Sequence, residues 1–160
     1  MNNNILIIGN CGVGKTWVMK NILNKYSTIP YKLGMFCFHE GEKIIVVGKY
    51  DGSVFEGSDK LSMAIMKDLD KFINYISKKN KIVICEGDRF MNNTYLIKSN
   101  PFVINISGDG FEGRKKRNSK QTQQHLKRIS TRVNKTKKDI VLNNSNECLE
   151  YLIKIIDEKN

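Results

Sequence analysis

Hydrophobic residues along the chain form two kinds of pattern, short continuous runs and longer stretches with helical spacing. The short runs predict β-strands at residues 5–8, 35–38, 43–48, 81–85, 101–106 and 139–142. Apolar residues that recur every three or four positions predict helices over residues 17–26, 61–76 and 149–156. Strands and helices therefore alternate along most of the chain.

This alternation predicts an α/β fold. The expected sheet is a mainly parallel five-stranded sheet flanked by helices, with an antiparallel hairpin partner that turns around residues 39–42. A chain of 160 residues has the usual size of one domain, so we expect a single domain over residues 1–160. In open α/β sheets, ligands bind at the carboxyl ends of the strands.

Charge is distributed unevenly along the chain. The formal net charge is +11, and the segment from Gly113 to Lys138 contains eleven Lys or Arg residues and no Asp or Glu. This segment has no clear apolar stripe, so we expect residues 113–138 to form a basic and largely solvated lid. The positive charge favours polyanionic partners such as nucleic acid.

Two features bear on where the protein works. The longest apolar runs fall far short of the roughly 20 residues that cross a bilayer, so we expect no membrane partner. The N-terminus, residues 1–4, has neither a basic region nor the apolar segment of a secretion signal. We therefore expect a cytoplasmic protein.

The strongest chemical signal lies between the first predicted strand and the first predicted helix. It is the pattern GxxxxGK[ST], formed by Gly9, Asn10, Cys11, Gly12, Val13, Gly14, Lys15 and Thr16. Backbone N–H groups of such a P-loop cradle phosphate oxygens, and the following helix adds its positive end. We expect Lys15 to reach the β- and γ-phosphates of ATP and Thr16 to ligate Mg²⁺. The motif in this context predicts a P-loop NTPase/kinase fold.

A second Mg²⁺ ligand is expected at the end of another strand. Glu86 directly follows the apolar run 81–85 and is our candidate for this metal-binding and catalytic role. Alternatively, Glu86 caps a helix that begins near Asp88, or pairs with Arg89. Asp88 is then the second candidate, and Arg89 is also a candidate contact to the acceptor substrate.

Phosphoryl transfer to an alcohol calls for a carboxylate close to the hydroxyl group. Asp51 lies in a glycine-flanked loop after a predicted strand and is our candidate base. Because Tyr-Asp-Gly is a common turn composition, an ordinary turn aspartate is the alternative. Asp59 and Asp88 compete for the role. Asp59 is also a candidate substrate contact, and Tyr50 is a candidate to stack on a base.

The arginines of the basic segment suit both ATP and a polyanion. Arg114 is our candidate for ATP binding and Arg128 for stabilising the transferring phosphoryl group, although spacing alone does not separate the two tasks. Asn143 follows the last predicted strand, where P-loop kinases often place an adenine-contacting turn. The residues expected to contact nucleic acid are Lys115, Lys116, Arg117 and Arg132.

Four segments together resemble a family of small phage-encoded P-loop kinases that phosphorylate 5-hydroxymethyluracil bases in DNA during thymine hypermodification. They are the motif at residues 9–16, the segment Tyr50–Ser62, the strand end Glu86–Arg89 and the basic segment from Arg114. The segment Tyr50–Ser62 is the most distinctive of the four.

The resemblance implies an ATP- and Mg²⁺-dependent kinase that acts on DNA containing 5-hydroxymethyluracil. Such an enzyme transfers the γ-phosphoryl group of ATP to the 5-hydroxymethyl oxygen, with Asp51 accepting the hydroxyl proton. It also implies that the base is flipped from the stack, and that a phage-encoded enzyme works in the host cytoplasm.

Two other functions remain open on the same residues. A small-molecule nucleoside or nucleotide kinase would use the same loop, magnesium ligand and lid, but would not bind DNA. A DNA-associated P-loop ATPase would couple hydrolysis to motion or binding and would need no acceptor alcohol. The sequence leaves the oligomeric state open.

Overall fold

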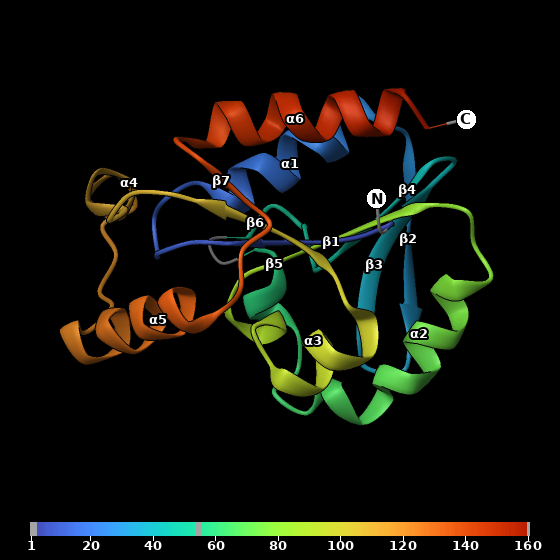
Figure 1. Ribbon diagram of the computed structural model, residues 1–160, viewed down its shortest axis with the longest axis horizontal. Coiled ribbons are helices and arrows are strands. Elements are labelled where there is room, and N and C mark those ends of the chain that lie inside the picture. The colour runs from blue at the N-terminus through green and yellow to red at the C-terminus, as the bar shows by residue number, and fades with distance from the viewer. Residues whose placement is uncertain (1–2, 54–55, 160) are drawn as a thin grey trace.

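A mixed β-sheet forms the centre of the structure (Figure 1). The computed structural model describes residues 3–53 and 56–159. Within these residues the sheet has seven strands in the order β2-β3-β4-β5-β1-β6-β7. Their bounds are β1 Asn4–Ile8, β2 Thr28–Leu33, β3 Phe36–Gly41, β4 Ile44–Val47, β5 Ile82–Glu86, β6 Phe102–Ile106 and β7 Ile140–Leu142.

The strand directions confirm the α/β class, the five parallel strands and the antiparallel hairpin partner, but the sheet is mixed and has one more antiparallel strand, β2, than expected. The neighbouring strands β4, β5, β1, β6 and β7 run parallel, whereas β3 pairs antiparallel with β4 and β2 pairs antiparallel with β3. The sequence did not predict β2. Its residues lie at the sheet edge and are mostly exposed, so they lack the apolar alternation of a half-buried strand.

Helices cover both faces of the sheet. Their bounds are α1 Lys15–Lys25, α2 Leu69–Ser77, α3 Asn93–Ser99, α4 Phe111–Lys116, α5 Gln123–Lys135 and α6 Ser145–Asp157. Figure 1 shows α1 and α6 stacked on one face, and α2, α3 and α5 on the other. No helix in the described ranges is both long and apolar enough to cross a bilayer.

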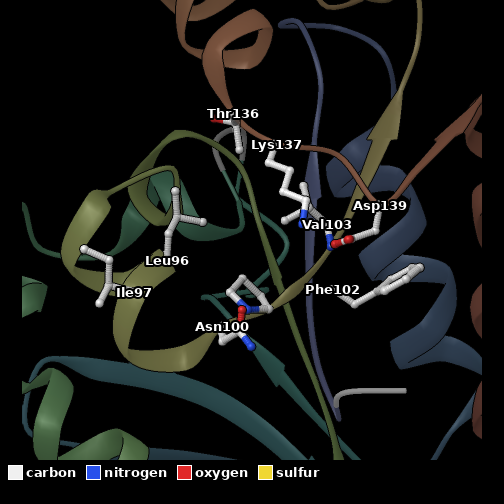
Figure 2. Close-up of a pocket in the computed structure, with 9 residues that line it drawn as sticks. Leu96, Ile97, Asn100, Phe102, Val103, Thr136, Lys137 and Asp139 are labelled. Atoms are coloured by element: carbon white, nitrogen blue, oxygen red, sulfur yellow. The ribbon is translucent and has the colours of Figure 1, made fainter.

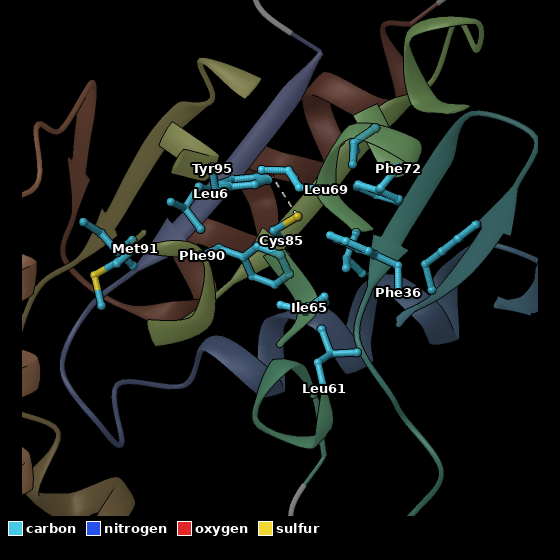
Figure 3. Packing of buried hydrophobic residues seen from close by; sticks show 14 of the residues in the cluster. Leu6, Phe36, Leu61, Ile65, Leu69, Phe72, Cys85, Phe90, Met91 and Tyr95 are labelled. Carbon is cyan, nitrogen blue, oxygen red and sulfur yellow. Dashed lines mark hydrogen bonds between the residues drawn. The ribbon is translucent and has the colours of Figure 1, made fainter. Parts of the chain in front are cut away.

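Two hydrophobic cores follow from the alternation of side chains along the strands. In β1, Ile5 and Ile7 pack under α1 and α6, whereas Leu6 and Ile8 join the core on the opposite face. Figure 3 shows this second core, in which the Tyr95 hydroxyl donates a hydrogen bond to the Cys85 sulfur at 3.2 Å. Each fully buried large apolar side chain stabilises the fold by about 1.5–3 kcal/mol.

The expected helix over residues 61–76 is shorter than predicted. Two 3₁₀ turns, Ser58–Lys60 and Ile65–Asp68, precede α2, which begins only at Leu69. The Ser62 hydroxyl accepts a hydrogen bond from the Ala64 N–H at 3.2 Å, and such local bonds compete with a helix. Apolar residues of the predicted stripe are nevertheless buried.

The basic segment is more firmly attached than its composition indicates. It contains α4 and α5, and α5 buries Ile129 and Val133 in the same core as Leu6. The expectation that the segment has no apolar stripe is therefore wrong for α5, although most of the segment is solvated as expected. Two buried residues spaced one helical turn apart dock this helix, while its other side chains are mostly exposed.

Candidate functional site

The carboxyl ends of the parallel strands lie together at one end of the sheet, as their pairing requires. A cavity of about 990 Å³ opens at these strand ends. Its lining comes from the Gly9–Thr16 loop, the exposed side of α1, the loop after β4, the end of β5, α4, α5 and the start of α6. This is the position at which open α/β sheets bind ligands.

The Gly9–Thr16 loop connects β1 to α1 and is tightly enclosed. Gly12 and Gly14 have φ values of 96° and 98°, which side chains rarely adopt. A Cβ atom on Gly12 would lie 2.2 Å from the carbonyl oxygen of Gly110, and one on Gly14 would lie 2.8 Å from Cβ of Ser145. Nζ of Lys15 donates to the carbonyl oxygens of Gly9 and Asn10 at 2.9 and 3.0 Å. The loop therefore curls around its own lysine at the N-terminus of a helix.

Thr16 and Glu86 meet beside this loop, as predicted from their positions after neighbouring strands. The Thr16 hydroxyl donates to Oε1 of Glu86 at 3.1 Å, and Glu86 is only 3% exposed. β1 and β5 pair in parallel, with Ile7 opposite Glu86, so the two strands hold the carboxylate at the start of the loop. A hydroxyl and a carboxylate are both ligands of the oxygen type that Mg²⁺ prefers.

The geometry is compatible with a Mg²⁺ ion that keeps several waters or phosphate oxygens. In the described ranges, no three His, Cys, Asp or Glu side chains converge as a metal site. Mg²⁺ bound with substrate phosphates needs only one or two protein ligands, so the Thr16–Glu86 pair meets this requirement.

Asp51, the predicted base, lies in an exposed turn. Its side chain is 57% exposed, and its Oδ1 atom accepts hydrogen bonds from the hydroxyl and the N–H of Ser53 at 2.6 and 3.2 Å. The Ser53 hydroxyl, with smaller contributions from that N–H and from Lys60, lowers the pKa of Asp51. Asp51 is outside the part of the described chain that lines the cavity, in line with the alternative of a turn aspartate.

Glu56 is a cavity carboxylate that sequence reasoning missed. Its side chain is 7% exposed, and its Oε2 atom lies 2.6 Å from Nζ of Lys20 on α1. The Lys20 hydrogen bond lowers the pKa of Glu56. Backbone hydrogen bonds between Lys49 and Gly57 close the loop that carries Glu56 and turn it towards α1. In the sequence, the only indication of a role for Glu56 was its position next to a glycine, Gly57, in a predicted loop.

Asp88 lies in the cavity wall but is paired with arginines of α5. Arg132 donates from Nη1 to Oδ1 of Asp88 and from Nη2 to the carbonyl oxygen of Met91. Nη2 of Arg128 lies 3.7 Å from Oδ2 of Asp88, and Nη2 also lies 3.3 Å from Nδ1 of His125. Both predicted arginines therefore contact the loop after β5, Arg132 more closely than the exposed Arg128.

The basic residues of α4 divide into two groups. Nη1 of Arg114 donates to the carbonyl oxygens of Cys11 at 2.7 Å and of Asp109, so this guanidinium braces the Gly9–Thr16 loop. Lys116 and Arg117 line the cavity. Lys115 is exposed on the same short helix and does not belong to the described cavity lining.

No family model matches the chain, and no curated protein matches it.

The predicted substrate contacts outside the basic segment are Tyr50, Arg89 and Asp59, and each has a different environment. Tyr50 is half-buried, and its ring lies edge-on to His39 with 6.0 Å between ring centroids. Arg89 donates from Nη1 to the sulfur of Met63. Asp59 belongs to the turn Ser58–Lys60, and its side chain lies outside the described part of the structure.

Asn143, the predicted adenine contact, is engaged at the start of α6. Its N–H donates to Oε2 of Glu147 at 2.9 Å, and its side-chain amide bonds the same carboxylate. The adjacent Asn144 caps α6. Ser145 and Asn146 line the cavity, and Asn143 does not belong to the described lining. The predicted adenine contact is therefore within three residues, along the sequence, of residues that line the cavity.

A second hollow lies at the start of β6, on the opposite edge of the sheet from the Gly9–Thr16 loop (Figure 2). It has a volume of about 460 Å³ and includes Ile97, Phe102 and Lys137 in its lining. Oδ2 of Asp139 accepts a hydrogen bond from the Val103 N–H at 2.7 Å there. None of the predicted site residues lines this hollow.

Proposed function

We propose that this protein has a P-loop NTPase/kinase fold and is an ATP- and Mg²⁺-dependent phosphotransferase. The observation that carries the proposal is the contact between Thr16 and Glu86 beside a glycine-rich loop that holds Lys15. This combination supplies phosphate-binding backbone, a cation and oxygen ligands for a metal at one edge of the sheet.

Each of these residues has a role that its position supports. The N–H groups of the Gly9–Thr16 loop and the N-terminus of α1 bind phosphate oxygens. Lys15 exchanges its bonds to the loop carbonyls for the β- and γ-phosphates of ATP. Thr16 and Glu86 hold Mg²⁺, which neutralises charge on the phosphates when bound. Arg128 and Arg132 are placed near the cavity to stabilise the transferring phosphoryl group.

The proposed acceptor is the 5-hydroxymethyl group of 5-hydroxymethyluracil in DNA. The sequence resemblance supports this choice, and the charge distribution agrees with it. Lys116 of α4 and Arg117, which directly follows this helix, lie at the cavity, and Lys115 beside them is exposed, so cations continue from the cavity to the surface. A DNA backbone along this surface would bring a flipped base to the phosphates. A phage-encoded enzyme of this kind works in the host cytoplasm.

Transfer of radiolabel from γ-labelled ATP tests the proposal. With Mg²⁺ present, we expect label on DNA containing 5-hydroxymethyluracil and none on matched thymine DNA. Label on free 5-hydroxymethyldeoxyuridine alone would show a small-molecule kinase instead. ATP hydrolysis stimulated by unmodified DNA, with no labelled acceptor, would show a DNA-associated ATPase.

A further inference from the structure

One side of the cavity follows the exposed side of α1. Four residues of this helix line it: Trp17, Lys20, Asn21 and Asn24. Their spacing of three, four and seven positions places them on a single helical stripe. Trp17 is 43% exposed although it is large and apolar, and it is the only tryptophan in the chain. An exposed indole inside a polar cavity is available to a planar ligand.

The loop after β4 adjoins this side of α1. Ser53 and Glu56 of this loop line the cavity, and Oε2 of Glu56 lies 2.6 Å from Nζ of Lys20. Gly57, the next residue, has φ of 91°, and a Cβ atom there would lie 2.5 Å from Oε1 of Glu86 and 3.6 Å from Oγ1 of Thr16. Glu56 is thus the residue next to a glycine that packs against the Thr16–Glu86 pair.

We propose that this side of the cavity is the acceptor subsite, in which Trp17 stacks on the acceptor nucleobase and Glu56 receives the proton of its attacking hydroxyl group. We call the following six residues the α1 subsite: Trp17, Lys20, Asn21, Asn24, Ser53 and Glu56. This inference rests on the proposed phosphotransferase function and assigns the base role to Glu56 in place of Asp51.

The amide groups of the stripe suit the polar edge of a pyrimidine. Nδ2 of Asn21 donates to the Trp17 carbonyl oxygen at 2.9 Å, which leaves Oδ1 to accept a hydrogen bond from a ring N–H. Asn24 lies one turn further along the same stripe and offers both a donor and an acceptor. A stacking ring flanked by amides is a common arrangement for recognising an unstacked base.

The acceptor hydroxyl oxygen forms a bond to the γ-phosphorus, and the bond from that phosphorus to the β–γ bridging oxygen breaks, with its electron pair leaving on ADP. The hydroxyl proton passes to the Glu56 carboxylate and then to water. Lys20 keeps this carboxylate ionised through the 2.6 Å contact, and the ionised form is the one that can take up the proton as the hydroxyl oxygen bonds to phosphorus.

Binding is tested first by the fluorescence of Trp17, which reports on a single position because no other tryptophan is present. The full chain is titrated with an oligonucleotide containing 5-hydroxymethyluracil, without ATP. We expect a saturable change in emission. Unchanged emission, while fluorescence anisotropy of a labelled oligonucleotide shows saturated binding, would overturn the assignment of Trp17.

Kinetics test the two roles separately. Trp17→Leu should raise the acceptor KM about tenfold, because base–aromatic stacking is lost. Glu56→Gln should lower kcat by about 10²–10⁴-fold with a similar acceptor KM. Glu42→Gln, which removes an exposed carboxylate in the β3–β4 turn at the opposite sheet edge, is the matched control and should behave as wild type. ATP affinity, measured by calorimetry, should change less than about twofold in all three.

The outcomes separate this inference from the proposed function. If the wild type transfers phosphate to DNA and the Trp17 and Glu56 variants do so equally well, the α1 subsite is wrong and the function stands. If Asp51→Asn removes turnover and Glu56→Gln does not, the base is Asp51. If the wild type binds ATP but labels no acceptor, the proposed function fails and the inference falls with it.

Discussion

The hydroxyl group of Thr16 lies 3.1 Å from Oε1 of Glu86, although the two residues are 70 positions apart in the chain. Parallel pairing of β1 with β5 creates this contact, because Glu86 is the last residue of β5 and Thr16 lies in the first turn of α1, directly after the loop that follows β1. The carboxylate is buried next to a hydroxyl that donates to it. Bound Mg²⁺ would replace this hydrogen bond with two metal–oxygen contacts.

The first prediction concerns this pair. Mg²⁺ should raise the ATP affinity of the wild type. Glu86→Gln and Thr16→Ala should each make this Mg²⁺-dependent gain in affinity about tenfold smaller, because each variant loses one metal ligand. Calorimetry with Mg²⁺ and with a chelator measures the gain. Since the two residues serve one ion, the double variant should lose less than the sum of the single losses.

Glu150→Gln is the control for this experiment, because it removes an exposed carboxylate from α6. Its Mg²⁺-dependent affinity should equal that of the wild type. Equal Mg²⁺ gains in the wild type and in the Glu86 and Thr16 variants would rule out this pair as the metal site.

The second prediction concerns the glycine that touches the pair. Gly57→Ala places a Cβ atom 2.5 Å from Oε1 of Glu86 at a φ of 91°. Gly52→Ala meets a similar φ of 80° but has nothing within 4 Å, so it isolates the backbone strain. Urea unfolding should show a loss of about 1–2 kcal/mol for Gly52→Ala. Gly57→Ala should lose about 1–3 kcal/mol more and also weaken Mg²⁺-dependent ATP binding. Equal losses in both variants would contradict the close approach.

The sequence predicted the parts of the fold and site that depend on local patterns. The apolar runs predicted the parallel strands, and the positions of Thr16 and Glu86 after two of them predicted their meeting. Glu56 was missed because its place depends on a backbone bridge between Lys49 and Gly57 and on a lysine from another element. The same limit applies to α5, where two buried residues among many charges dock the helix.

The third prediction uses the cysteines as reporters. Burial raises the pKa values of Cys85 and Cys148 to about 12, so few of these thiols are ionised near neutral pH. Cys11 and Cys37 are half-buried, and Cys11 alone of the two lines the cavity. A thiol reagent at pH 8 should therefore label Cys11 and Cys37 well before the other two.

Nucleotide binding distinguishes the two reactive thiols. Mg²⁺-ATP should slow the labelling of Cys11, because phosphates would occupy the loop that contains it. Cys37, on β3 and outside the described cavity lining, serves as the internal control and should react at the same rate with or without ATP. Mass spectrometry of peptides assigns the label. Protection of Cys37 rather than Cys11 would place the nucleotide elsewhere.

The fourth prediction concerns a buried ion-pair cluster near the turn between β3 and β4. Glu40 of β3 has a side chain that is 7% exposed and lies 2.6 Å from Nζ of Lys81 and 3.2 Å from Nζ of Lys79. The Tyr75 hydroxyl also donates to Glu40. Burial alone would raise the pKa of Glu40, but the hydrogen bonds from these three side chains outweigh it and lower the pKa.

A lowered pKa in the folded state means that the ionised carboxylate stabilises the fold above its unfolded pKa. That stabilisation is lost as the pH falls through the folded value. Glu40→Gln should therefore reduce the free energy of unfolding by about 2 kcal/mol at pH 7. The difference from the wild type should shrink as the pH falls below the unfolded pKa, about 4.3, and through the lower folded value, where the wild-type carboxylate also becomes neutral. Urea unfolding across this range, with the exposed Glu42→Gln as the matched control, measures both effects. A difference that is independent of pH would show that shape, and not charge, accounts for the contribution of Glu40.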